Sequence, residues 1–281
     1  MPQAEVLLTL PVYENPPVVE TVVGIQFRAL KGFTNAHLGA FWQSLGQADW
    51  PSVTDMPTLP RQAERFTPEA PWGRHINLHL TQDPASRLQI RNRDGNRMVQ
   101  LQNDRLHLNW LGQGGDCYPN YSIVRGEFRK CLSHLTGFIE TSGCGEFTPD
   151  QREVTYVNHI PKGEVWQSPA DWGFFKPLSG VPSINGLIDA ESFGGQWHFI
   201  IPEQRGRLHI EWQHGKQPDP EQTEFVRLTL TARGPVEEST EPEESILAGI
   251  DLGHETIVNA FRGLMSEAAN KEWKLQNATE V

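Results

Sequence analysis

The stretch from residue 98 to residue 128 constrains the fold most, because its pattern changes from that of a strand to that of a helix. Apolar and polar residues alternate at 99–102 and again at 106–109, and this period of two is typical of strands buried on one face. Asn103-Asp104 separates the two runs as a turn. After 112–115, apolar residues recur at the spacing of one helix face, at Tyr121, Val124, Phe128, Leu132 and Leu135. The stretch predicts an antiparallel sheet with a covering helix.

The second half of the chain repeats this order of elements. In the first half we predict strands at 18–27, 74–80, 88–92 and within 98–110, and helices at 35–45 and 119–140. In the second half we predict strands at 154–160, 186–193, 196–202, 207–213 and 224–233, then a helix at 245–270. Proline-rich segments at 49–73 and 161–184 are predicted to be loops.

These elements predict an α+β protein with two pseudo-repeated halves, 1–145 and 146–281, packed together as one unit. Each half is expected to be an antiparallel sheet covered by a long helix, broadly of the saddle or helix-grip kind, because alternating strands need a cover on their apolar face.

Composition narrows the class of protein. The 281 residues are 37% hydrophobic, which is enough for a large core. The net charge of −11 disfavours extended contact with nucleic acid or with an anionic membrane, so we expect neither as a partner. No apolar stretch is long enough to span a membrane. The three cysteines lack metal-ligand spacing, and a reducing compartment fits them best, so we expect a cytoplasmic protein.

Four short motifs are distributed along almost the whole chain. They are Asn15–Glu20 (NPPVVE), then Val99–Leu101 with Asn109-Trp110 and Tyr118-Pro119, then Thr155–Asn158 (TYVN), and finally Leu252–His254 with Phe261 and Trp273. In this order and spacing they resemble a sporadically distributed family of bacterial proteins of uncharacterised function. The resemblance implies an accessory bacterial protein with the patchy occurrence of defence-associated genes. It implies no reaction, cofactor or catalytic residue.

Catalytic and metal-binding patterns are weak in this sequence. His75 and His79 lie four residues apart in a predicted strand, but neither an HExxH nor a CxxC pair is present, so we interpret them as solvent-facing strand histidines rather than metal ligands. There is no GxSxG motif, and the segment GQGGD lacks the Lys-Ser/Thr of a phosphate loop. Asp251 and His254 are interpreted as groups at a helix start. We therefore expect no metal, no cofactor and no enzyme activity.

Two sets of residues are candidate binding residues. Trp166, Trp172, Phe174 and Phe175 lie in the proline-rich loop, where they are expected to be exposed anchors for a protein partner, and packing onto the sheet is the alternative. The second set is Asn109, Trp110, Tyr118, Tyr121, Tyr156 and Asn158. These side chains are expected to meet at the junction of the two halves, where their hydrogen bonds tie sheet ends to helix starts and where a small ligand could bind.

The function expected from the sequence is that of a non-enzymatic binding or regulatory protein that acts through a protein partner. A bacterial defence or toxin-neutralising module is the expected setting. Two alternatives stay open: a hydrolase or nuclease whose histidines and carboxylates gather only in three dimensions, and a small-ligand-binding protein. The sequence does not indicate the oligomeric state.

Overall fold

A computed structural model describes residues 10–66, 86–112, 118–179, 190–217 and 220–276. Its main element is a nine-stranded sheet in which every neighbouring pair of strands is antiparallel. In order across the sheet, the strands are β3 (Ser52–Pro57), β4 (Ser86–Arg91), β5 (Arg97–Gln102), β6 (Arg105–Leu111), β2 (Val18–Phe27), β7 (Pro149–Pro161), β10 (Glu224–Pro235), β9 (Gly206–Lys216) and β8 (Gly194–Ile201). The prediction of an α+β fold with an antiparallel sheet is confirmed.

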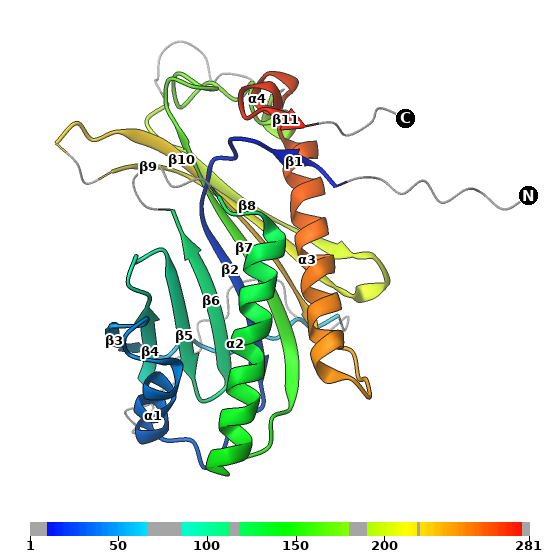
Figure 1. Cartoon of the computed structure of the whole chain (residues 1–281). Helices are drawn as coiled ribbons and strands as arrows, with labels where there is room; N and C mark the ends of the chain where they lie inside the picture. The colour runs from blue at the N-terminus through cyan, green and yellow to red at the C-terminus, as the bar shows by residue number, and fades with distance from the viewer. Residues whose placement is uncertain (1–9, 67–85, 113–117, 180–189, 218–219, 277–281) are drawn as a thin grey trace, which may run out of the picture.

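Helices cover one face of this sheet (Figure 1). The described residues form four α-helices, α1 (Asn35–Leu45), α2 (Tyr121–Ser142), α3 (Pro242–Leu264) and α4 (Glu267–Glu272). Helix α2 packs on β6 and β2, and α3 packs on β7 and β10. A short second sheet joins the two ends of the described chain, with β1 (Val12–Tyr13) paired to β11 (Leu275–Gln276). No helix of the described residues is long and apolar enough to cross a membrane.

The apolar residues that alternate with polar ones in the strands form the core. Leu106, Leu108 and Trp110 of β6 are buried, and they lie on the face that α2 covers, together with Leu132 and Leu135 of the helix. Helix α3 approaches β7 closely at Gly249, where a Cβ would lie 2.1 Å from Cδ of Arg152. The absence of a side chain at this helix position therefore sets how closely α3 and β7 pack.

Both long helices lie close to where the sequence predicts them, and their ends have local causes. The helix predicted at 245–270, however, ends at Leu264, and the short α4 follows after a break at Met265. Asn120 accepts a hydrogen bond from the Ser122 N–H at the start of α2, and Gly143 ends this helix with a φ of 61°. Helix α3 begins at Pro242, followed by two glutamates that favour a helix N-terminus. Asp251 and His254 consequently lie inside α3, and their interpretation as groups at a helix start was wrong.

Two other predictions need correction, and one falls outside the described residues. The segment 49–73, predicted to be a loop, contains β3, an edge strand whose side chains are mostly exposed and which therefore shows no apolar alternation. Residues 190–193 of the strand predicted at 186–193 have no strand structure. The strand predicted at 74–80, with His75 and His79, lies outside the described residues.

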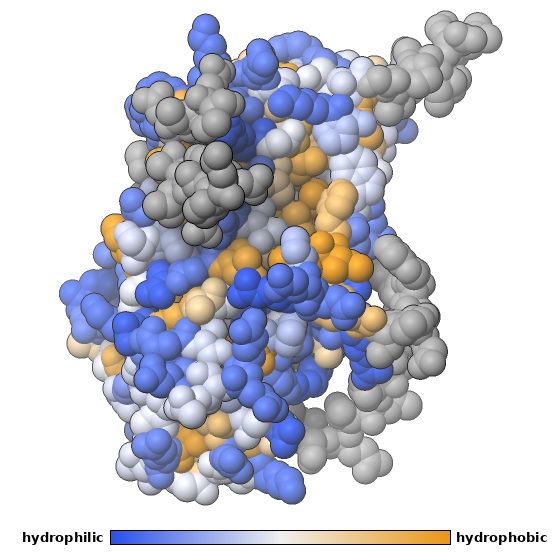
Figure 2. All heavy atoms as spheres, turned by 90° about the vertical axis from the view of Figure 1, so that its right-hand side faces the viewer, coloured by the Kyte–Doolittle hydropathy of each residue, from blue (hydrophilic) through white to orange (hydrophobic). Residues whose placement is uncertain are grey.

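Figure 2 shows the side of the molecule on which α3 lies, where apolar side chains gather among hydrophilic ones. Most large apolar side chains of the described residues are buried, and the exposed ones are Leu10, Val12, Ile123, Phe199 and Ile200. Phe199 and Ile200 belong to β8, which is the last strand of the sheet on that side. Among the described residues of the nine-stranded sheet, the exposed large apolar side chains therefore lie on β8, at its edge.

Candidate functional site

The sheet face turned away from α2 and α3, here called the open face, carries polar side chains in rows across the strands. Gln102, Arg105, Gln26 and Gln151 lie opposite one another on β5, β6, β2 and β7. A second row contains Gln100, His107, Glu153 and Arg233. Because successive side chains of a strand point to opposite faces, the residues between the apolar core positions all reach this face.

The first row binds the backbone of residues 59–64, a segment without helix or strand structure that we call the strap. The Gln102 amide accepts a hydrogen bond from the Leu59 N–H at 3.0 Å and donates one to the Leu59 carbonyl at 3.1 Å. The Gln26 amide does the same with Gln62, at 3.0 and 2.8 Å. Each glutamine thus pairs with both backbone groups of one strap residue, as a neighbouring peptide group would.

Two further contacts extend this backbone recognition along the strap. Gln151 accepts from the Glu64 N–H at 3.2 Å, and Arg105 donates to the Pro60 carbonyl at 2.9 Å. The side chains of the strap at residues 60–63 are exposed. The open face therefore holds Leu59 and Gln62 through their backbone groups, a mode of binding that depends little on the sequence of the bound segment. The Arg61 side chain adds a sequence-dependent contact, because it donates to the Phe27 carbonyl at 2.7 Å and pairs with Asp150.

An ion-pair network continues from the end of the strap. The carboxylate of Glu64 accepts from Nε2 of His209 at 2.7 Å and from Nη1 of Arg233 at 3.2 Å, and it also pairs with Arg207. Arg233 in turn donates to Glu153 at 2.5 Å. Burial alone would raise the pKa of Glu64 and Glu153, but the hydrogen bonds and positive charges around them outweigh burial and hold each pKa below its ordinary value. Both carboxylates are therefore ionised at neutral pH.

The His107 ring lies across β2 at Gly24. A Cβ on Gly24 would be 2.2 Å from Cδ2 of the His107 ring, so the glycine makes room for this ring. Nε2 of His107 then lies 3.9 Å from the Glu153 carboxylate, too far for a direct hydrogen bond. Burial lowers the pKa of His107 to about 4, against a smaller opposing effect of Glu153. His107 is therefore neutral at pH 7.

Asn109, one of the residues singled out in the sequence, also lies on the open face. It accepts from the Gln100 amide at 2.8 Å and donates to Glu20 at 2.6 Å. Its neighbour Trp110 points to the helix side and packs edge-on against Tyr118, with ring centroids 5.3 Å apart. The strand alternation thus separates two residues that the sequence analysis placed together.

Three of the other predicted junction residues meet between α2, α3 and β7, in what we call the interhelical cluster. The hydroxyls of Tyr118 and Tyr156 are 2.9 Å apart, and the Tyr156 hydroxyl is 2.7 Å from Nδ1 of His254. Tyr121 stacks on the His254 ring at 3.7 Å and donates to Asp251 at 2.7 Å. Burial lowers the pKa of His254 to about 4 and raises that of Tyr118 to about 12.

The interhelical cluster also includes an ion pair, whereas Asn158 lies apart from it. Arg125 of α2 holds Asp251 of α3 through two hydrogen bonds, at 2.6 and 2.8 Å. Asn158 donates to the Leu228 carbonyl of β10. These contacts join the two long helices to each other and to the sheet, so this cluster has a clear structural role.

The aromatic loop does not have the exposure expected of partner anchors. Trp166 is fully buried and donates from its indole to the Ile160 carbonyl at 3.0 Å. Phe174 and Phe175 are buried too, and Phe175 stacks on Trp197 with ring centroids 5.8 Å apart. Only Trp172 is partly exposed. The expectation of four exposed aromatic anchors is therefore corrected, because the loop packs onto the sheet, which was the alternative.

The groups gathered on the open face are suited to recognition. Amides donate and accept hydrogen bonds, and guanidiniums donate them, without exchanging protons at neutral pH. The hydroxyls of Thr155 and Thr231 bond to each other at 2.8 Å. Among the residues that the structure describes, no group of three or more histidine, cysteine, aspartate or glutamate side chains could hold a metal ion.

Sequence reasoning missed Gln26, Glu64, Glu153 and Arg233 as members of one site. The alternation that placed Leu106 and Leu108 in the core also assigned the intervening residues to a common face, so that signal was available for β5 and β6. No local pattern indicated that Glu64, from a segment read as a loop, would reach strands more than 140 positions away.

Comparisons with known proteins do not add to this picture. No protein-family model matches the chain, and a search of curated proteins found no significant match. The function is therefore argued from the geometry of the open face.

Proposed function

We propose that this chain is a non-enzymatic binding protein that acts through a protein partner, and that it holds an extended segment of that partner on the open face. The observation that carries this proposal is the pairing of Gln102 and Gln26 with both backbone groups of Leu59 and Gln62. A sheet face that already binds one segment of chain by its backbone has the chemistry to bind another.

The proposed place for the partner lies on the outer strands β10 and β9. Gln213 and Arg227 are opposite each other there, just as Gln102 and Arg105 are on β5 and β6. The side chains of Gln213 and Arg227 are exposed, and neither makes a hydrogen bond with the other residues that the structure describes. We call this pair, together with Thr229, the outer patch. It offers amide and guanidinium groups of the same kind as those that bind the strap.

The order of the strands across the sheet supports the same proposal. From the middle of the sheet outward, the strand order is β2, β6, β5, β4 on one side, where β3 follows as an additional edge strand, and β7, β10, β9, β8 on the other. Each series starts with the first strand that its half contributes to the nine-stranded sheet, and in the sequence it precedes a long helix, α2 or α3. We propose that the two halves are repeats that form one saddle-shaped sheet, in which the outer patch is the counterpart of the pair that binds the strap.

The setting that we propose is an accessory role in a bacterial defence or toxin-neutralising module, as the family resemblance implies. A hydrolase or nuclease has less support. His107 and His254 are both held neutral by burial, and the carboxylates Glu64 and Glu153 are engaged by arginines. A general acid or base needs a pKa closer to the working pH.

Affinity purification from the native host, followed by mass spectrometry, tests the proposal. Wild-type protein is expected to recover a specific protein, and Gln213→Ala combined with Arg227→Ala is expected to lose it. Gln43→Ala combined with Arg28→Ala is the matched control, since it removes the same two side-chain types from exposed positions elsewhere. Recovery of nucleic acid with a steep salt dependence, or equal recovery by both double variants, would contradict the proposal.

A further inference from the structure

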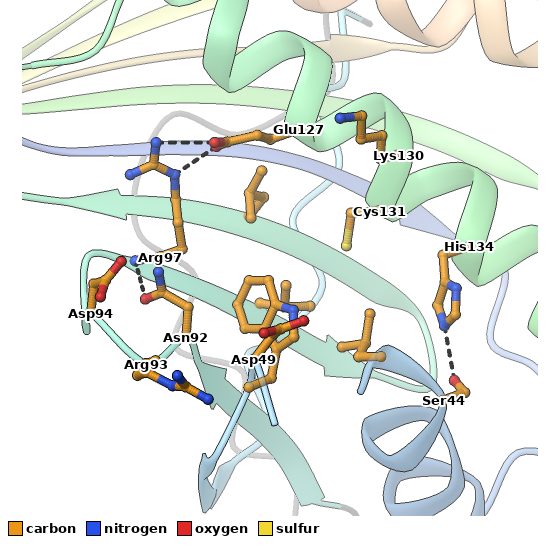
Figure 3. A pocket seen from close by; sticks show the side chains of 14 residues that line it. Ser44, Asp49, Asn92, Arg93, Asp94, Arg97, Glu127, Lys130, Cys131 and His134 are labelled. Atoms are coloured by element: carbon orange, nitrogen blue, oxygen red, sulfur yellow. Dashed lines mark hydrogen bonds and ion pairs between the residues drawn. The ribbon is translucent and has the colours of Figure 1, made fainter. Parts of the chain in front are cut away.

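A pocket of about 690 Å³ lies between α1, α2 and the turn that joins β4 to β5 (Figure 3). Its floor consists of Val99, Leu108 and Cys131, all of which are buried members of the core. Leu45 and Trp50 add apolar walls. The volume and the apolar floor match those of sites for small organic molecules.

Two interactions between different elements hold the walls of this pocket in place. Arg97 of β5 donates two hydrogen bonds to Glu127 of α2, at 2.6 and 3.1 Å. At the other end, the Ser44 hydroxyl of α1 is 2.8 Å from Nε2 of His134 in α2. Figure 3 shows these two pairs at opposite ends of the pocket. The pocket is therefore formed before any ligand binds, which reduces the entropy lost on binding.

Opposite charges stand on the two sides of the mouth. Lys130 extends from α2, while Asp49 and Asp94 lie on the side of the β4–β5 turn (Figure 3). All three side chains are exposed, and none has a hydrogen bond or ion pair with the other residues that the structure describes. Arg93, also on the rim, donates to the Ala48 carbonyl at 2.8 Å. The pocket thus offers an ammonium on one side, two carboxylates and the Arg93 guanidinium on the other, and an apolar floor between them.

We propose that this pocket binds a small zwitterion with an apolar body, for which a dipeptide of two large aliphatic residues is the simplest example. The ligand carboxylate faces Lys130, its ammonium group faces Asp49 and Asp94, and its side chains lie on the apolar floor. A ligand with only a negative charge would be repelled by the two unpaired carboxylates. A ligand with only a positive charge would be repelled by Lys130. The pocket lies on the helix side of the sheet, so this inference is independent of the outer patch.

Isothermal titration calorimetry with three peptides tests the assignment. Leucyl-leucine carries both charges, N-acetyl-leucyl-leucine lacks the ammonium, and leucyl-leucinamide lacks the carboxylate. Wild-type protein is expected to bind leucyl-leucine more tightly than either analogue. Lys130→Met should weaken leucyl-leucine binding about fivefold, the size of one solvent-exposed ion pair. The same substitution should not weaken the binding of leucyl-leucinamide, because this peptide has no carboxylate for Lys130 to bind and its positive charge is repelled by Lys130.

A second variant tests the carboxylates of Asp49 and Asp94 at the entrance of the pocket. Asp49→Asn combined with Asp94→Asn should weaken leucyl-leucine but not N-acetyl-leucyl-leucine, and Lys31→Met and Asp55→Asn are controls at exposed positions outside the pocket. Since every substituted side chain is exposed, circular dichroism spectra should not change. No binding of leucyl-leucine, equal affinities for the three peptides, or equal effects of Lys130→Met and Lys31→Met would each overturn the assignment.

Discussion

Gly24 decides where the His107 ring can lie on the open face, and this is a property of one residue. A Cβ at position 24 would lie 2.2 Å from Cδ2 of His107 and 2.8 Å from its Nε2, and the ring is buried, so it has little room to move. We expect Gly24→Ala to reduce the free energy of unfolding by about 1–3 kcal/mol, as overpacked cores do.

Chemical denaturation measures the effect of Gly24→Ala, with Gly39→Ala in α1 as the control. A Cβ at Gly39 meets no atom within 4 Å, and alanine favours a helix over glycine by about 1 kcal/mol. The two Gly→Ala substitutions should therefore change stability in opposite directions. A Gly24→Ala protein as stable as wild type would show that His107 is not confined over β2.

The buried histidines make stability depend on pH. Burial lowers the pKa of His107 and His254 to about 4, from an ordinary value of 6.5. Between these two values the unfolded chain binds more protons than the folded one, so stability rises with pH across this window. Each histidine contributes a slope of up to about 1.4 kcal/mol per pH unit. Glu64 and Glu153, whose pKa values are lowered, add a further loss of stability in more acidic solution.

Unfolding by urea at a series of pH values between about 4 and 7 measures this dependence. The slope should be steep for wild-type protein and shallower for His107→Gln, which lacks one of the two buried imidazoles. A His107→Gln protein with the wild-type slope would mean that the folded state binds a proton at His107 as readily as the unfolded chain does.

At the scale of elements, one hydroxyl group of the interhelical cluster joins α3 and the segment directly before α2 to β7. The Tyr156 hydroxyl is within hydrogen-bond distance of both Tyr118 and His254, and it is buried. Tyr156→Phe leaves two partly buried polar groups without this partner, so we expect a loss of about 1–3 kcal/mol. Tyr121→Phe, whose partner Asp251 also binds Arg125, should cost less, about 0.5–1.5 kcal/mol. If thermal unfolding showed that the two variants lose the same stability, the Tyr156 hydroxyl would not be the main link of the cluster.

Whether glutamine side chains hold the strap by its backbone can be tested by removing them. Gln26→Ala combined with Gln102→Ala removes four hydrogen bonds to Leu59 and Gln62. Trypsin should then cleave after Arg61 or Arg65 faster than in wild-type protein, because a released segment fits a protease more readily. Gln43→Ala in α1 is the control, and cleavage at the wild-type rate in the double variant would show that the glutamines do not hold the strap.

Local periodicity was sufficient to predict the elements with a regular buried face. The helix predicted at 119–140 corresponds to α2, and the one predicted at 245–270 to α3 and, after a break, α4. The strands predicted within 98–110 correspond to β5 and β6. Strand β3 was missed because its side chains are mostly exposed, so no apolar alternation marks it. The aromatic loop was misjudged for a related reason, since irregular segments have no period that tells which side chains turn inward.

At the scale of the whole molecule, the sequence predicted an antiparallel sheet with long helices but not how its parts combine. The pairing of β2 with β7 joins segments about 130 residues apart, and such a pairing is not encoded in the period of either strand. The open face depends on that pairing, because it brings Gln26 next to Gln151 and Gly24 next to Glu153. A site formed across the two halves of one sheet could therefore be recognised only in the folded chain.

The central claim is that the outer patch binds a partner segment in the way that the pair of Gln102 and Arg105 binds the strap. Photo-crosslinking in the native host tests it most directly, with a benzophenone amino acid in place of Thr229, which lies on the open face of β10 beside Glu211. The same residue in place of Asn259, exposed on α3, is the control. We expect a crosslink to one extended segment of a single protein from position 229 and none from position 259. Crosslinks from position 259 alone, or to nucleic acid from position 229, would contradict the claim.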